Sequence, residues 1–407
     1  MSLRGRAGDE RPGVSVGGGR MIEALFVNSG ILGQRTFAAF VEQAFAGERD
    51  GIRATQVVLT DALSVGERAL RRVLCARLWP DGAGGKNLDR FRYRAELNAG
   101  LIARGRIRRL EAAGKRFDVI HFHRQTTAYA SLERMRRTPS IVSIDCTQRC
   151  VMQLAASPAE ARSYLPNLRR DGEIFRAARL IVSTSRWAAD TLREDYPDCA
   201  TEVAVMPNPV LLEHFDPAWP REREVRAAAV ADYRPRVLFM GGDFARKGGD
   251  DLVAAWREGG FGARARLDLV THAAVPAATE ADGIHVHTGV PAHSPAWRAL
   301  WREADVFVLP TRDEAFGMVF QEAAAAGLPS IGTRINAVPE LILDGETGLL
   351  VPPRDRGALA AALGRLLASA EVRREMGMRA RRHVEATADP EAYRAKLADA
   401  IHRLAGR

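Results

Sequence analysis

The chain of 407 residues has few cysteines, few lysines and no long apolar run. Its cysteines are Cys75, Cys146, Cys150 and Cys199. They show neither disulfide nor zinc-ligand spacing, which favours a reducing compartment, so we expect a cytoplasmic protein. No apolar run approaches the roughly 20 residues of a membrane-spanning helix. The Gly- and Arg-rich start lacks the apolar core of a signal peptide, so we expect residues 1–20 to form a disordered leader.

Positive charge is in excess, and arginine supplies nearly all of it. The formal net charge is +9 at pH 7. Lysine occurs only at Lys86, Lys115, Lys247 and Lys396. An excess of basic residues favours the binding of anionic partners such as nucleotide diphosphates or phospholipid surfaces. Nucleic acid is not expected as a partner, because no recognised nucleic-acid-binding module is present. The Arg-rich helical segments between Arg68 and Arg109 are either solvated faces or contacts with an anionic membrane at its inner face.

Short apolar runs alternate with helical segments through the first half of the chain. We expect strands at 21–27, 53–60, 117–123, 140–144, 180–183 and 202–210. Helical segments are expected from about 34 to 47, and from 62 to 114 with a break at 80–85. Strands that alternate with helices predict a parallel sheet wound by crossover helices.

The same alternation restarts after a charged, Pro-punctuated segment, 211–233, which we interpret as the domain junction. Strands are expected at 236–240, 267–271, 284–287, 304–309, 330–332 and within 338–353, and helices at about 356–368, 371–385 and 390–404. The predicted fold class is α/β, with two Rossmann-like doubly wound domains that face each other across a cleft. The predicted boundaries are 21–215, 216–388, and a C-terminal helix in 389–407 that packs back on the N-terminal domain.

One stretch in the second half joins a strand, a loop and a helix and carries two carboxylates. Ala304–Leu309 is typical of a buried strand, and the loop after it runs to Gly317. Glu314 lies in the loop, and Glu322 lies about a turn and a half inside the helix, with its carboxylate leaning toward the helix start. The unpaired N–H groups and the dipole at that start favour a bound phosphate. Because ligands of parallel sheets bind beyond the carboxyl ends of the strands, we expect this loop to line the cleft.

Each candidate residue also has a structural interpretation. Glu314 alone is consistent with an ordinary loop carboxylate, and Lys247 with a solvated turn residue. Glu322 sits among apolar neighbours with no basic residue within a turn, and an unpaired buried charge is costly. The hydroxyl groups of a ligand would supply the missing donors. His121 shares a strand face with His123 and is interpreted as a packed histidine.

Taken together, these motifs resemble the retaining glycosyltransferases of the GT-B fold, family 4. The similarity is densest over 237–353, where Lys247 precedes Gly248 and seven residues separate Glu314 from Glu322. Further matching segments there are 305–310, 339–341 and 344–348, and weaker ones lie at 118–123, 183–187 and 205–209. The resemblance implies a UDP- or GDP-hexose donor held by the C-terminal domain.

The resemblance also implies roles for individual residues. Glu322 would accept hydrogen bonds from the ribose, Arg246 and Lys247 would neutralise the diphosphate, and Glu314 would hold sugar hydroxyls. The implied donor-binding residues are Gly241, Gly242, Arg246, Lys247, Val290, Glu314, Phe316, Gly317, Met318, Val319 and Glu322. The implied catalytic residues are His123, Arg246, Lys247 and Glu314. The implied acceptor or diphosphate loop contains Asn28, Ser29, Gly30 and Gly33.

The implied reaction transfers a hexose to a hydroxyl group with retention of configuration. The acceptor is a glycan, a lipid-linked compound or a small molecule. No cofactor and no metal are expected, because no His/Cys cluster or Asp-x-Asp motif is placed to hold a cation. A front-face substitution is expected, since no carboxylate is evidently placed as a nucleophile.

One departure from the family concerns the phosphate-binding charge. Family members often have an Arg directly after the position of Gly241, whereas this chain has Gly242 there. Either Arg246 alone supplies the positive charge that the missing Arg would provide to the phosphates, or phosphate binding is weaker than in the family. Alternatives to a transferase are a nucleotide-sugar epimerase, a phosphorylase that would need a Schiff-base lysine for pyridoxal phosphate, and a nucleotide-sugar-binding protein that has lost catalysis.

Overall fold

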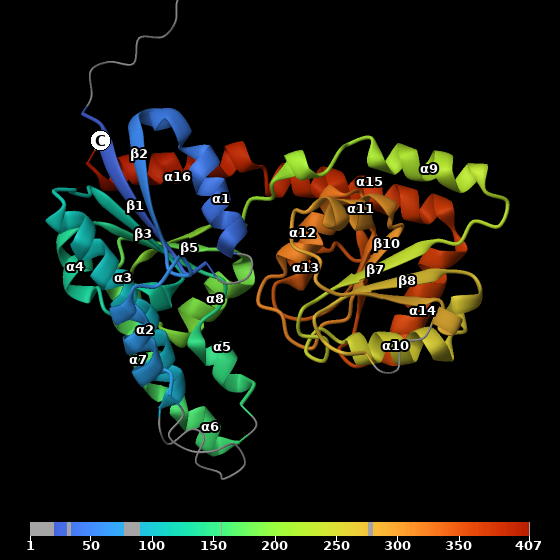
Figure 1. The fold of residues 1–407 in the computed structure, drawn as a ribbon, viewed down its shortest axis with the longest axis horizontal. Coiled ribbons are helices and arrows are strands. Elements are labelled where there is room, and N and C mark those ends of the chain that lie inside the picture. The colour runs from blue at the N-terminus through green and yellow to red at the C-terminus, as the bar shows by residue number, and fades with distance from the viewer. Residues whose placement is uncertain (1–19, 31–33, 77–89, 156, 276–279, 407) are drawn as a thin grey trace, which may run out of the picture.

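The computed structural model describes residues 20–30, 34–76, 90–155, 157–275 and 280–406. These residues form two α/β domains, each built on a six-stranded parallel sheet (Figure 1). The strand orders are β2-β1-β3-β4-β5-β6 and β12-β11-β10-β7-β8-β9. The predicted fold class is therefore confirmed. Residues 1–19 of the predicted leader, Gly33 and the predicted break at 80–85 lie outside the described residues.

The N-terminal domain carries the first six strands. They are β1 (Ile22–Asn28), β2 (Ile52–Val58), β3 (Val119–His123), β4 (Ser140–Ile144), β5 (Leu180–Ser183) and β6 (Glu202–Val205). Its α-helices are α1 (Gln34–Ala44), α2 (Val65–Leu74), α3 (Phe91–Ala112), α4 (Leu132–Arg137), α5 (Gln148–Gln153), α6 (Pro158–Ser163), α7 (Leu165–Ala177) and α8 (Arg186–Asp195). Short 3-10 turns lie at η1 (Ala46–Gly51) and η2 (Gln125–Ala128).

The C-terminal domain carries the other six strands. They are β7 (Arg236–Met240), β8 (Arg266–Val270), β9 (Ile284–His287), β10 (Val306–Leu309), β11 (Ser330–Thr333) and β12 (Gly348–Val351). The helices that follow β6 are α9 (Trp219–Ala229), α10 (Gly249–Glu258), α11 (Pro295–Glu303), α12 (Met318–Ala325), α13 (Val338–Leu341), α14 (Arg356–Ala368), α15 (Ala370–Thr387) and α16 (Pro390–Leu404). Short turns lie at η3 (Leu212–His214), η4 (Phe261–Ala263) and η5 (Glu280–Asp282).

Two expected elements differ in the structure. The strand expected at 202–210 ends at Val205, because Pro207 and Pro209 have no N–H group to extend the sheet. The segment 211–233, interpreted as a junction, contains the eleven-residue helix α9. Its many charges hide the helical period, although Pro220 in the first turn is a favoured helix start. Its first residue, Trp219, is buried in the core of the C-terminal domain.

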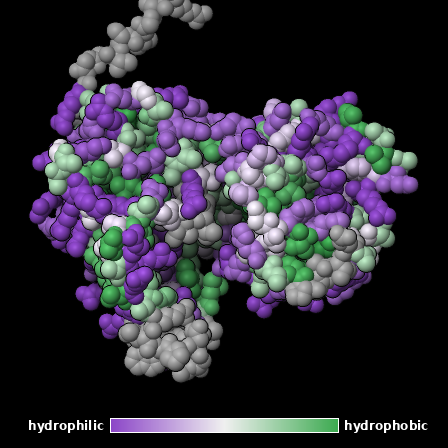
Figure 2. All heavy atoms as spheres, viewed as in Figure 1, coloured by the Kyte–Doolittle hydropathy of each residue, from purple (hydrophilic) through white to green (hydrophobic). Residues whose placement is uncertain are grey.

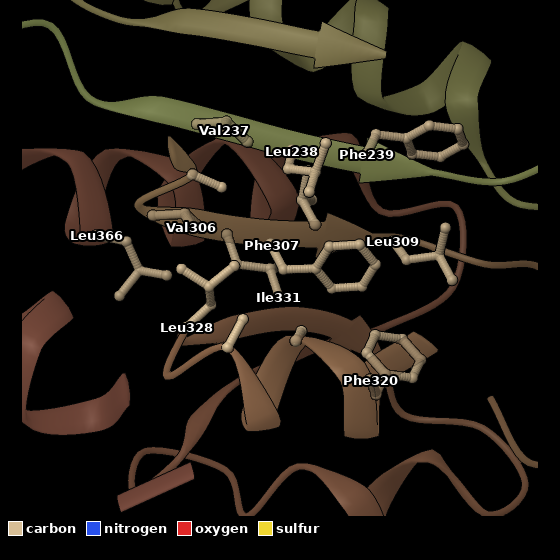
Figure 3. Packing of buried hydrophobic residues seen from close by; sticks show 14 of the residues in the cluster. Val237, Leu238, Phe239, Val306, Phe307, Leu309, Phe320, Leu328, Ile331 and Leu366 are labelled. Atoms are coloured by element: carbon tan, nitrogen blue, oxygen red, sulfur yellow. The ribbon is translucent and has the colours of Figure 1, made fainter. Parts of the chain in front are cut away.

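The strand–loop–helix unit of the C-terminal domain rests on an aromatic core. Figure 3 shows apolar side chains of β7, β10 and β11 packed together, with Phe320 of α12 against them. The rings of Phe307 on β10 and Phe320 on α12 meet edge to face with centroids 5.7 Å apart. Such pairs contribute about 0.5–1.5 kcal/mol beyond area burial. Since Phe320 lies two residues before Glu322, this contact fixes the helix that carries that carboxylate.

Contacts between the domains fix one wall of the cleft relative to the other. The Glu340 carboxylate of α13 accepts hydrogen bonds from the backbone N–H groups of Arg186 and Trp187 at 2.9 and 2.8 Å. Glu340 thus caps the start of α8 in the other domain, where unpaired N–H groups favour an anion. Gln321 of α12 donates to the carbonyl of Asn208 at 3.0 Å. Two segments that showed only weak family similarity, 183–187 and 205–209, therefore lie at this domain contact.

The C-terminal helix lies against the N-terminal domain. In Figure 1 the red helix α16 runs beside α1 and away from α15, which lies on the other domain. The Tyr393 ring meets Phe37 and Phe40 of α1 edge to face, with centroids 5.9 and 5.4 Å apart. The chain thus returns to the N-terminal domain at its end.

Candidate functional site

A cavity of about 860 Å³ lies between the two domains, at the carboxyl ends of both sheets. Figure 2 shows the two lobes with a hollow between them. Every residue predicted to bind the donor lines this cavity: Gly241, Gly242, Arg246, Lys247, Val290, Glu314, Phe316, Gly317, Met318, Val319 and Glu322. His123 lines it from the N-terminal domain. The structure thus brings these residues together around one space.

The two loops that carry the predicted charges are in close contact. Gly248, with φ of 75°, follows Lys247 and packs against the loop after β10. A Cβ atom at this position would lie 1.9 Å from the carbonyl oxygen of Pro310, so only glycine permits the contact. Arg246 reaches the same loop, where its guanidinium donates to the carbonyl of Asp313 at 2.8 Å. Gly248 is therefore required for the close packing of the two loops that carry Lys247 and Glu314.

Both predicted cations of the C-terminal domain already have carboxylate partners. Lys247 forms an ion pair with Glu314, and each of these side chains is only 14% exposed. The Arg246 guanidinium lies 3.2 Å from Asp243, which also lines the cavity. Glu314 therefore balances the charge of Lys247, and either side chain can act on a ligand only by shifting from its partner.

Helix α12 begins at the cavity. Gly317 is its N-cap with φ of 94°, and a Cβ there would come within 2.8 Å of the Phe320 ring. Glu322 lies one turn further along the helix and faces the cavity. No described residue donates a hydrogen bond to its carboxylate, and burial raises its pKa to about 8. An acid without a partner among the described residues, beside the N-terminus of a helix, suits a ligand with both hydroxyl and phosphate groups.

The two histidines of β3 have different surroundings. The His123 ring stacks on Phe37 with centroids 3.8 Å apart and lines the cavity. Burial lowers its pKa to about 3, against a smaller opposite effect of its hydrogen bond with Asn208. His123 is therefore neutral at pH 7. His121 is buried and hydrogen-bonds with the Ser143 hydroxyl at 2.6 Å, as expected for a packed histidine.

The predicted loop after β1 stands apart from the described cavity lining. Asn28 is the last residue of β1, is fully buried, and donates to Gln56 at 3.0 Å. Ser29 is also buried, and Gly30 accepts a hydrogen bond from Arg35 at 3.0 Å. None of the three lines the cavity among the residues that the structure describes, so their role near the acceptor stays a prediction.

Sequence reasoning missed most of the N-terminal wall. Arg124, Asp145 and Thr184 follow β3, β4 and β5 directly and line the cavity, together with Ser143 and Asn208. Arg124 has a φ of 89°, which is unusual for a residue with a side chain and is found most often at functional sites. A usable signal was present for three of them, since Arg124, Asp145 and Thr184 are polar residues that each come directly after the last residue of a strand.

A buried acid holds the loop that carries Arg124. Asp171 of α7 accepts hydrogen bonds from the Tyr129 hydroxyl at 2.7 Å and the Gln125 amide at 3.3 Å. It also accepts from the backbone N–H of Gln148 at 3.2 Å. Burial raises the pKa of Asp171 to about 7, against the effect of these donors. The network joins the loops after β3 and β4, so Arg124 and its neighbours have a fixed position.

Comparison with known families accounts for both domains. The profile described as Glycosyltransferase Family 4 matches residues 56–214, and that described as Glycosyl transferases group 1 matches residues 234–369. The chain is 31% identical over 301 residues to a D-inositol 3-phosphate glycosyltransferase of Arthrobacter sp. (strain FB24), covering 69% of each chain. This protein belongs to the family 4 glycosyltransferases. A shorter match of this glycosyltransferase, 42% over 81 residues, is to an N-acetyl-alpha-D-glucosaminyl L-malate synthase of Bacillus anthracis, covering 20% of this chain and 21% of that one.

Solved structures show that the glycosyltransferase has the GT-B fold. A sucrose-phosphate synthase from Thermosynechococcus elongatus superimposes with a TM-score of 0.72 at 21% identity, over 95% of this chain and 99% of that one. HepE of Anabaena, solved in complex with UDP-glucose, gives a TM-score of 0.59 at 14% identity, over 94% and 100%. The resemblance predicted from the motifs is thus confirmed for family and fold.

Proposed function

We propose that this glycosyltransferase moves a hexose from a nucleotide diphosphate sugar to a hydroxyl group of a phosphate-bearing acceptor, with retention of configuration. The observation that carries the donor assignment is Glu322, an unpaired and partly buried acid facing the cavity one turn inside α12. A ribose would satisfy this acid, and the diphosphate would then meet the N-terminus of α12 and Lys247. Related folds have been solved with UDP-glucose and with UDP-2-fluoro glucose, which makes UDP the first nucleotide to try.

Departure of the nucleotide diphosphate is the step that the C-terminal wall assists. As the bond between the sugar C1 and the phosphate oxygen breaks, negative charge grows on that oxygen, where Lys247, Arg246 and the α12 N–H groups stabilise it. The acceptor oxygen forms its bond to C1 on the same face, and its proton passes to the leaving phosphate. No metal ion and no cofactor is part of this proposal. Glu314 would exchange Lys247 for the hexose hydroxyls when the donor enters.

Recognition of the acceptor is assigned to the N-terminal wall. Among the described lining residues of this domain, Arg124 is the only permanent cation. Its guanidinium lies 3.5 Å from Glu96, a long ion pair that leaves donors for a ligand. Relatives of this chain are named for D-inositol 3-phosphate, which bears a phosphate and several hydroxyls. Asp145 and Thr184 offer an acceptor and a hydroxyl for such hydroxyl groups.

The donor assignment is tested by thermal unfolding in the presence of UDP, GDP and their hexose conjugates. Ligand that binds only the native state stabilises it by mass action, about 2.7 kcal/mol at a hundredfold excess over the dissociation constant. We expect one nucleotide to raise the melting temperature, and the corresponding nucleoside alone to raise it less, because the diphosphate contacts are lost. No shift with any nucleotide would contradict the proposal. Slow hydrolysis of the bound sugar nucleotide would further exclude a purely binding protein.

The acceptor assignment is tested with Arg124→Gln. We expect the KM for inositol 3-phosphate to rise about 10- to 100-fold, the effect of losing one charge-assisted hydrogen bond, with the affinity for the nucleotide unchanged. Unphosphorylated inositol should be used equally poorly by both proteins. Arg136→Gln on the surface of α4 serves as the matched control. A soluble phosphate ester and an inositol phospholipid, assayed in parallel, distinguish a free from a lipid-linked acceptor, and an unchanged KM for both would remove Arg124 from acceptor binding.

A further inference from the structure

Helix α2 presents an apolar stripe and a basic stripe side by side on its outer face. Val65 is 75% exposed and Val73 is 69% exposed, and both lie on one side of the helix with exposed Ala69 between them at four-residue spacing. Arg68 and Arg72 are also exposed and form the neighbouring stripe at the same spacing. Figure 2 shows hydrophobic and hydrophilic spheres intermixed at this part of the N-terminal domain. In the described structure, Val65 and Val73 are not part of a hydrophobic core.

The opposite side of α2 is firmly attached to the domain. Glu67 is buried, completes a capping box with Ser64, and pairs with Arg106 and Arg109 of α3. Arg94 of α3 donates to carbonyls at the end of α2, including that of Leu74 at 2.8 Å. Glu67 is the only acidic residue of α2, and its charge is balanced by these two arginines of α3. The outer face is therefore held in a fixed orientation with an excess of positive charge.

We infer that the outer face of α2, formed by Val65, Arg68, Ala69, Arg72 and Val73, docks on an anionic phospholipid bilayer. The valines enter the boundary between headgroups and acyl chains, while the guanidinium groups bind headgroup phosphates. The two arginines favour an anionic bilayer over a neutral one, because on a neutral bilayer each guanidinium group would lose bound water without gaining a counter-charge. No described helix is long and apolar enough to span a membrane, so the contact is a surface contact.

The position of α2 connects this contact to the cleft. Only six residues, 59–64, join the end of β2 to α2. Within them, the Thr60 hydroxyl donates to the carbonyl of Gly30 at 3.4 Å, in the loop after β1. The bilayer would therefore lie beside the carboxyl edge of the N-terminal sheet, where a lipid-borne hydroxyl could reach the wall that holds Arg124. The docking itself does not depend on the proposed transferase reaction.

The test is flotation of the full chain with vesicles of phosphatidylcholine alone or with one-quarter phosphatidylglycerol. We expect binding only to the anionic vesicles, weakening as salt is raised. The pair Arg68→Gln and Arg72→Gln should lower partitioning about 25-fold, at about fivefold for each arginine. The pair Val65→Ser and Val73→Ser should lower it about tenfold while keeping the salt dependence.

The matched control is the pair Arg136→Gln and Arg137→Gln on α4, which removes the same charge from exposed positions of the same domain. We expect this pair to bind the vesicles as the wild type does. Equal loss from the α2 and α4 pairs, or no binding of the wild type to anionic vesicles, would overturn the inference. Nucleotide-induced thermal shifts, measured without vesicles, verify that each variant is folded and report separately on the proposed function.

Discussion

Replacement of Lys247 by Ala should lower turnover about 10²-fold, because the proposed mechanism would lose one preorganised charge that stabilises the leaving diphosphate. The measurement is steady-state transfer, or donor hydrolysis when no acceptor is present. The side chain lines the cavity beside the N-terminus of α12 and is mostly buried, so water replaces its charge poorly. Turnover close to that of the wild type would remove Lys247 from the mechanism.

The ion pair with Glu314 determines the control for this substitution. In Lys247→Ala, the Glu314 carboxylate stays mostly buried without its partner, and an unpaired buried charge destabilises the fold by about 3–5 kcal/mol. The double variant Lys247→Ala with Glu314→Gln removes both charges, so we expect its melting temperature to recover toward that of the wild type. Its turnover should remain low. Recovery of turnover together with stability would assign the effect of Lys247→Ala to misfolding instead of lost catalysis.

Substitution of Glu322 by Gln should remove a pH dependence from the proposed nucleotide binding. Burial raises the pKa of Glu322 to about 8, so in the free protein this acid is protonated at pH 7. Ribose hydroxyls donate to the ionised form, and binding should therefore release a proton. We expect the wild-type affinity for the nucleotide to rise between about pH 7 and 9, and the affinity of Glu322→Gln to be lower and flat over this range. Calorimetry in buffers of different ionisation enthalpy measures the proton release directly.

The stability of the two proteins should differ in the same pH range. The native state binds more protons than the unfolded state between the usual pKa of 4.5 and the raised value of about 8. The stability contributed at low pH is therefore lost as pH rises through this window. Glu322→Gln should melt higher than the wild type at alkaline pH, with the difference shrinking toward acid pH. Glu371→Gln, at an exposed position of α15, is the control, and equal pH profiles for all three proteins would contradict a raised pKa.

Much of the fold could be predicted because the decisive signals are local. The strands at 140–144, 180–183, 236–240 and 284–287 lie where the apolar runs placed them. The exceptions have local causes as well. Prolines shorten β6 to Val205, and charged residues hide the period of α9. The C-terminal wall of the cavity could be predicted equally well, since Glu314, Gly317 and Glu322 belong to one strand–loop–helix unit.

The N-terminal wall of the cavity could not be predicted in the same way. Arg124, Asp145 and Thr184 follow three different strands, and only the parallel order of β3, β4 and β5 brings their positions to one edge. The spacing of these three residues along the chain does not indicate that they lie close together. The cap that Glu340 places on α8 likewise joins two motifs about 150 residues apart, whose proximity depends on how the domains pack.

The sequence by itself determined the class of fold, the family and the residues that form the C-terminal wall of the cleft, because each rests on residues close together along the chain. Tertiary structure alone decided that Lys247 is paired with Glu314, that Glu322 has no hydrogen-bond partner among the described residues, and that Arg124 faces the same cavity. It also decided which side of α2 packs on α3 and which side is exposed in the described part of the chain. These properties depend on distances between segments remote in sequence and on the exclusion of water between them, and neither is encoded by local periodicity.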